Sequence, residues 1–142
     1  MRAVLDTNVL VSALRSRRGA SFEIVRRLRL GQWRAVLSNH LLFEYEEVLK
    51  RESSALRLSA EAVDELLNAV AARSDECALV PGWKPMLSDP DDEPLVQLAC
   101  ESGANMIVTH NVRDLLPAVE LGVAVLKPNE FLARIREAES GG

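Results

Sequence analysis

The densest run of acidic residues in the chain stands just before an apolar segment with helical spacing. Asp91, Asp92 and Glu93 precede residues 94–99, so they lie where a helix would begin. Acids at a helix N-terminus have a structural explanation, because the unpaired N–H groups and the helix dipole favour negative charge there. They can also hold a metal ion. Metal binding becomes the better explanation only if the fold brings other acidic residues close to these three.

Helical spacing separates these three acids. Asp92 falls on the same face as Leu95 and Ala99, whereas Asp91 and Glu93 are rotated to either side. We therefore expect Asp92 to point inward. Asp91 and Glu93 remain alternatives for the same position, or acids that stabilise the start of the helix.

Further polar residues follow short apolar runs directly. Asp6 comes after residues 3–5, and the turn from Thr109 to Asp114 comes after residues 106–108. Open parallel sheets bind their ligands at the carboxyl ends of the strands. Asp6, Asp92 and this turn would all lie at that edge, a convergence that helix capping alone explains poorly.

A further acid comes from the helix expected after Ser38. Glu44 borders its apolar stripe, Glu46 borders the opposite edge, and Glu47 points away. Spacing leaves Glu44 and Glu46 both open, and an exposed surface acid is the common alternative for either.

Apolar runs alternate with segments of helical periodicity along the whole chain, which predicts an α/β fold with a parallel sheet of about five strands and helices on both faces. We expect strands at residues 3–5, 35–37, 77–80, 106–108 and 123–126, and loops at 15–19, 51–57 and 83–90. Ser38 and Ser59 are expected to cap helices, and Pro128 to open the last one.

Composition is that of one ordinary globular domain. The 142 residues are 48% hydrophobic and 27% charged, and we expect a single domain over residues 1–138 with a flexible tail at 139–142. Asp6 interrupts the N-terminal apolar stretch, and no apolar run approaches the roughly 20 residues that span a bilayer. We therefore expect a cytoplasmic protein with no membrane partner. Cys77 and Cys100 match no zinc or disulfide pattern.

The net charge of −4 is unevenly distributed, because residues 1–34 carry eight arginines against two acids. Such asymmetry is typical of nucleic-acid binding, although a solvated helix face gives the same count. Arg15, Arg17 and Arg18 form a basic loop that could contact phosphates.

Several carboxylates gathered without a cation would repel one another unless a hard divalent ion compensates them. Mg²⁺ or Mn²⁺ suits an all-oxygen ligand set and supports phosphodiester hydrolysis, in which paired ions lie roughly 3.5–4 Å apart.

Taken together, these fragments resemble the PIN domain family, in the branch of VapC-like toxins of toxin–antitoxin pairs. The resemblance runs over nearly the whole chain and rests on residues 3–10, Ser38 with Leu41 and Glu44, Asp92 with Leu95, Val96 and Ala99, and residues 107–111 with Asp114. It implies a PIN-like three-layer fold and a metal-dependent endoribonuclease.

The resemblance also assigns roles to residues. Asp6, Glu44 and Asp92 match the acidic triad that would hold the metal, and Asp114 would be a fourth acid. Asn111 stands where many members have an acid, so one or two metal ions remain open. The remaining matches, taken as substrate-positioning, are Asn8, Ser38, Thr109 and Asn111. A homodimer, an RNA substrate and an antitoxin whose peptide covers the acidic groove are further implied.

Two other functions compete with this interpretation. A catalytically silent RNA-binding or protein-interaction module would keep the fold with an incomplete metal site. A phosphoacceptor receiver domain would share Thr109 and Lys127, but it needs paired acids after the first strand and an acceptor Asp after the third. Nucleophilic catalysis with His40 or His110 has little support, since no nucleophile elbow is present.

Overall fold

A five-stranded parallel sheet forms the centre of the protein, which a computed structural model describes over residues 1–141. The strand order is β3-β2-β1-β4-β5. The strands are β1 (Arg2–Leu5), β2 (Arg34–Leu37), β3 (Ser74–Glu76), β4 (Met106–Val108) and β5 (Ala124–Leu126). The predicted parallel sheet of about five strands is therefore confirmed.

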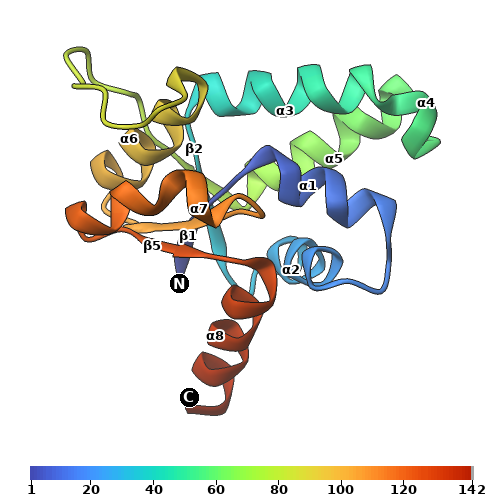
Figure 1. The fold of residues 1–142 in the computed structure, drawn as a ribbon. Helices are drawn as coiled ribbons and strands as arrows, with labels where there is room; N and C mark the ends of the chain where they lie inside the picture. Colours follow the sequence, from blue (N-terminus) through green and yellow to red (C-terminus); the bar gives the residue numbers. More distant parts are fainter. Residues whose placement is uncertain (142) are drawn as a thin grey trace.

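Helices cover both faces of the sheet, with α6 on one side and α1, α2 and α5 on the other (Figure 1). The helices are α1 (Thr7–Arg15), α2 (Ala20–Arg29), α3 (Asn39–Arg51), α4 (Ser53–Leu56), α5 (Ala60–Ala72), α6 (Glu93–Glu101), α7 (Val112–Leu115) and α8 (Pro128–Gly141), with 3-10 turns η1 (Pro90–Asp92) and η2 (Leu116–Leu121). As predicted, Ser38 caps α3 and Ser59 caps α5, each accepting a hydrogen bond of 3.1 Å from a backbone N–H. No helix within residues 1–141 is both long and apolar enough to cross a membrane.

The central strands β1 and β4 fix the edge at which the acids gather. Leu5 pairs in register with Val108, and the side chains of Val4, Leu5 and Ile107 are fully buried. The next residue, Asp6, donates its N–H to the carbonyl of Val108 at 2.9 Å. Strand pairing thus carries Asp6 and the turn after β4 to the same place.

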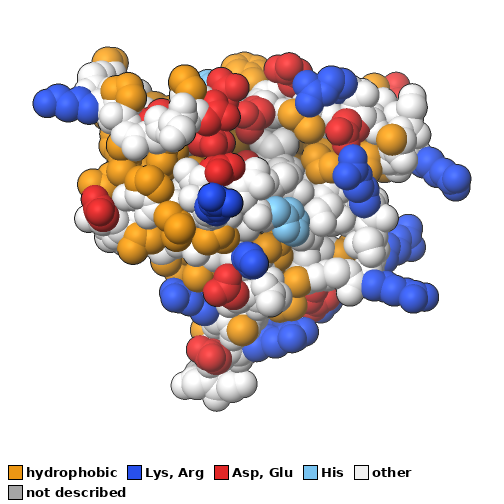
Figure 2. Space-filling model, viewed as in Figure 1, with side chains coloured by type: hydrophobic (Ala, Val, Ile, Leu, Met, Phe, Trp, Pro, Cys, Tyr) orange, Lys and Arg blue, Asp and Glu red, His pale blue; other side chains and the backbone are white. Residues whose placement is uncertain are grey.

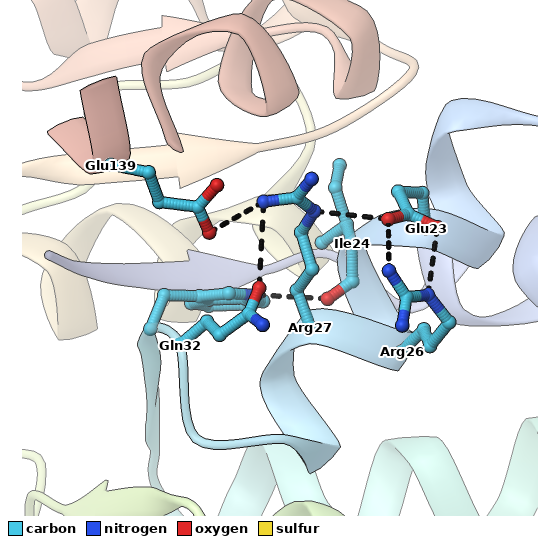
Figure 3. Close-up of polar contacts among 7 residues, drawn as sticks. Glu23, Ile24, Arg26, Arg27, Gln32 and Glu139 are labelled. Carbon is cyan, nitrogen blue, oxygen red and sulfur yellow. Dashed lines mark hydrogen bonds and ion pairs between the residues drawn. The ribbon is translucent and has the colours of Figure 1, made fainter. Parts of the chain in front are cut away.

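The end of the chain differs from the expected flexible tail. Residues 139–141 continue α8, and Glu139 forms an ion pair with Arg27 of α2 at 2.6 Å (Figure 3). Beside it, the indole of Trp33 donates to the carbonyl of Ile24 at 2.8 Å and meets the ring of Phe131 edge-on, with centroids 4.9 Å apart. These contacts bind α8 to α2. Gly142 lies outside the described residues.

The strand predicted at residues 77–80 is wrong, because β3 lies three residues earlier. As an edge strand, β3 can carry polar side chains, and Asp75 forms ion pairs with Arg2 and Arg34, both at 2.9 Å. The apolar run that follows lies in a loop instead, where Val80 is largely exposed. The predicted connection at 51–57 also contains one short helix, α4.

The long loop before α6 is held by a single carboxylate. Glu93, only 8% exposed, accepts the indole N–H of Trp83 at 2.9 Å and the N–H of Met86 at 2.6 Å, as well as the N–H of Leu87. Burial opposes its ionised form, but the three hydrogen bonds prevail and leave the pKa of Glu93 below its usual value. The first residue of α6 therefore fixes the loop from Trp83 to Pro90.

We predict that Glu93→Gln lowers the free energy of unfolding by about 1–3 kcal/mol, because the amide nitrogen cannot accept a hydrogen bond and leaves a donor unpaired. Urea unfolding measures the loss, and hydrogen exchange should accelerate at the amides of Met86 and Leu87. Glu65→Gln, a change at an exposed acid of α5, is the matched control. Equal stability of the two variants would contradict this role for Glu93.

Candidate functional site

Four carboxylates line a cleft of about 660 Å³ at the carboxyl ends of β1 and β4. The acids are Asp6, Glu44, Glu52 and Asp92, and the other lining residues are Thr7, Asn8, Val11, Ser12, Arg15, Val48, His110 and Asn111. Figure 2 shows acidic side chains gathered on this face near the first turn of α3, with basic side chains spread over the rest of the face and along its right edge. The fold thus brings together the three acids of the expected triad.

Asp6 is the buried member of the group. It precedes α1 and is only 9% exposed. Its Oδ2 accepts hydrogen bonds from the hydroxyl of Thr109 at 2.7 Å and from the amide of Asn8 at 3.3 Å. Burial raises the pKa of Asp6 above its ordinary value, the Thr109 hydrogen bond opposes that rise, and repulsion from Glu44 adds to it.

Of Glu44 and Glu46, which the sequence left as alternatives, Glu44 lines the cleft from α3 and Glu46 does not. Glu44 accepts a hydrogen bond from the hydroxyl of Thr7, whereas Glu46 lies 3.7 Å from Lys50 in a surface ion pair. The neighbouring residue, Tyr45, is fully buried and donates its hydroxyl to the carbonyl of Leu5. This bond ties α3 to the end of β1 and so fixes where Glu44 stands.

Asp92 completes the triad at the N-terminus of α6. Partial burial, followed by repulsion from Asp89, Asp6, Asp114 and Asp91, raises the pKa of Asp92 to about 6. Asp114 therefore acts on Asp92 electrostatically, but it lines a separate hollow on the far side of α7. The structure brings three of the four expected acids into the cleft and places the fourth beside it.

The donor set of the cleft suits a hard divalent cation. Within residues 1–141, Asp6, Glu44 and Asp92 form no ion pair with lysine or arginine, so their mutual repulsion is uncompensated. Oxygen ligands of this kind are those that Mg²⁺ and Mn²⁺ prefer. No three acidic, His or Cys side chains of residues 1–141 converge as a finished metal site.

The polar residues of the expected site hold the strand ends together. The N–H of Asn111 donates to the hydroxyl of Thr109 at 3.0 Å, and the N–H of His110 donates to the amide oxygen of Asn8 at 3.3 Å. Thr109 is fully buried, so it can reach Asp6 but not a substrate. Asn8 and Asn111 do line the cleft.

Other expected contacts lie elsewhere. Ser38 is buried as the cap of α3 and does not line the cleft. Arg15 lines it but is paired with Glu52 at 2.9 Å. Arg17 and Arg18 are exposed in the loop before α2 and do not line the cleft.

Asp91 and Glu93 do not share the position of Asp92. Glu93 points toward the loop that it anchors, and Asp91 is exposed on the outer side of η1, near His40. No sequence pattern indicated that Thr7 binds Glu44 or that Glu52 lines the cleft. His110 is exposed and lines the cleft, with its Nε2 3.4 Å from the hydroxyl oxygen of Ser21.

Comparisons with known proteins match the chain to a family model and to a solved structure. A family model described as PIN domain matches residues 2–113. Among solved structures, the chain is similar to one in the crystal structure of VapBC2 from Rickettsia felis bound to a DNA fragment from their promoter, with a TM-score of 0.62 and 14% sequence identity over 89% of this chain and 98% of that one. No curated protein matches the sequence significantly.

We predict that Asp92→Asn stabilises the metal-free protein at pH 7.5. A folded pKa of about 6 against an ordinary 3.8 means that Asp92 stabilises the fold when protonated, and that this contribution is lost as pH rises through 6. Removing the charge should raise the free energy of unfolding by about 1 kcal/mol after solvent screening.

Urea unfolding in EDTA at pH 4.5 and 7.5 measures this difference in the free energy of unfolding, which should fall to about a third at the lower pH. Glu61→Gln in α5 is a matched control at an exposed acid. In the presence of Mn²⁺, wild type should become the more stable of the two proteins, because the ion should bind wild type more tightly than Asp92→Asn. A stability difference that does not change with pH would contradict the repulsion around Asp92.

Proposed function

Because the chain belongs to the PIN domain family, we propose that it is a metal-dependent endoribonuclease that cleaves RNA phosphodiesters in the acidic cleft. The observation that carries the proposal is the meeting of Asp6, Glu44 and Asp92 around one cavity, each from a different element. Phosphodiester hydrolysis requires charge compensation at the phosphate and an activated water, and a cluster of unpaired carboxylates can recruit the ion that supplies both.

The residues of the cleft would have different roles in this reaction. Asp6 and Asp92 would hold the Mg²⁺ or Mn²⁺ ion, with Glu44 as the third acid. When bound, the ion would polarise the phosphate and lower the pKa of a coordinated water. Thr109 orients Asp6, and Thr7 orients Glu44, through the hydrogen bonds described above.

Substrate contacts would come from the rim. Asn8 and Asn111 line the cleft, and Arg15 could exchange its half-buried partner Glu52 for a phosphate. Asp114 would contribute negative charge beside Asp92 as the fourth acid. Arg17 and Arg18 would act at longer range, by attracting the RNA strand.

We further propose that this nuclease is the toxin of a cytoplasmic toxin–antitoxin pair, held inactive by an antitoxin peptide over the cleft. The fold similarity to a chain of a VapBC2 complex supports this assignment. A receiver domain is disfavoured, because Asp75 of β3 is paired with Arg2 and Arg34 and no Asp follows that strand directly.

We predict that Asp6→Asn abolishes Mn²⁺-dependent cleavage of a mixed-sequence RNA, lowering the rate at least about 100-fold, because it removes a charged ligand from the buried end of the cleft. Gel analysis of labelled RNA measures the rate, and thermal unfolding in EDTA should show an unchanged or slightly higher midpoint. Expression of wild type, but not of Asp6→Asn, should arrest bacterial growth.

Glu61→Gln is the control for that experiment and should cleave as wild type does. Equal cleavage by Asp6→Asn and wild type would place the activity at another site. No cleavage by wild type would favour the catalytically silent module instead.

We also propose a homodimer. Phe43 on α3 is the most exposed large apolar side chain of residues 1–141, at 69%, and it borders a hollow that also includes Pro90 and Pro94. An exposed aromatic group of this kind is typical of an interface.

We predict that light scattering gives twice the chain mass for wild type and the single-chain mass for Phe43→Glu, because a buried carboxylate at an interface is unfavourable. Val80→Glu, a change at a 60% exposed position, is the control and should remain dimeric. A monomeric wild type would contradict the homodimer.

A further inference from the structure

A second hollow, of about 450 Å³, adjoins the acidic cleft on the other side of α7. His110 and Asn111, just before α7, face the cleft, whereas Arg113 and Asp114 within α7 face the hollow. The opposite wall comes from the loop before α6 and includes Met86, Ser88, Asp89 and Pro90. A strand that leaves the cleft over α7 would enter this hollow next.

The wall of the hollow is held in place by hydrogen bonds. Glu93 fixes the backbone of Met86 and Leu87, and Asp89 caps η1 by accepting the N–H of Asp91 at 2.9 Å. Asp89 is thereby turned toward its own backbone. The hollow is preformed, so binding a ligand there does not require the loop to lose conformational entropy.

Arg113 is the only basic side chain that lines this hollow in the described part of the chain. It is exposed, and within residues 1–141 it forms no ion pair or side-chain hydrogen bond, although Asp89 and Asp114 line the same space. By contrast, Arg15 at the cleft is already paired with Glu52, and Arg27 is paired with Glu23 and Glu139.

An unpaired arginine beside the acidic cleft can attract a phosphate group of the RNA. The acids around Asp92 repel an approaching RNA backbone, and a cation beside them lowers that barrier for one phosphate. The guanidinium group matches phosphate geometry through two parallel N–H donors. Such a contact positions the strand without reading its sequence.

We propose that Arg113 binds a backbone phosphate of the RNA strand next to the one cleaved, and so sets which bond of the strand lies over the acidic cleft. This inference rests on the proposed nuclease function and adds a substrate-binding residue to it. Arg113 is thus a positioning residue for the substrate, and the hollow between α7 and the loop before α6 is the neighbouring subsite.

The test measures binding and cleavage separately. Fluorescence anisotropy of a labelled single-stranded RNA, in the uncleaving Asp6→Asn background, should show Arg113→Ala raising Kd about 3–10-fold at 100 mM KCl and reducing the salt slope by about 0.7. Arg113→Lys should recover part of the affinity. Arg136→Ala removes an equally exposed charge from α8 and should change Kd less than twofold.

In the otherwise wild-type protein with Mn²⁺, Arg113→Ala should raise KM and leave kcat within about twofold. If wild type cleaves RNA but Arg113→Ala and Arg136→Ala have the same Kd and salt slope, the role of Arg113 is overturned. The proposed nuclease function would still stand. A lower kcat with unchanged Kd would also overturn the role of Arg113, in favour of a structural effect on α7. Failure of wild type to bind or cleave RNA would overturn both.

Discussion

The hydrogen bond from Thr109 to Asp6 is the contact on which the site depends most. Asp6 is taken out of water at the end of β1, where burial favours its neutral form, and the Thr109 hydroxyl at 2.7 Å favours the charged form that a metal needs. Thr109 can do so only because β4 pairs beside β1 in register. The order of the strands therefore supplies the hydrogen bond that opposes the rise in the pKa of Asp6.

Around that bond, the fold concentrates negative charge and does not neutralise it internally. Several arginines near the N-terminus join elements of the fold: Arg2 and Arg34 hold β3 through Asp75, and Arg27 holds α8. The acids of the cleft are left to repel one another, as the raised pKa of Asp92 shows. Uncompensated repulsion destabilises the metal-free fold and favours cation binding, so stability and function are opposed at this site.

Sequence patterns predicted the features that depend on a few neighbouring residues, such as helix caps and strand ends. Capping chemistry located Ser38 and Ser59, and the succession of apolar run and polar turn located Asp6 and Thr109. The patterns failed where tertiary contacts decide. The apolar run at residues 77–80 resembles a strand, but an edge strand needs no apolar side chains, and Asp75 satisfies two arginines there. Glu93 resembles its acidic neighbours in sequence, and only the folded loop shows that it binds Trp83, Met86 and Leu87.

The most direct measurement is a crystal structure of the protein soaked in Mn²⁺, with anomalous scattering recorded at the manganese edge. If the cleft is a metal centre, an anomalous peak should lie between the carboxylates of Asp6 and Asp92, within about 2.0–2.3 Å of an oxygen of each, as for other hard divalent ions. A cleft without a peak at millimolar Mn²⁺, or a peak elsewhere on the surface, would contradict the claim that these acids are gathered to hold a metal.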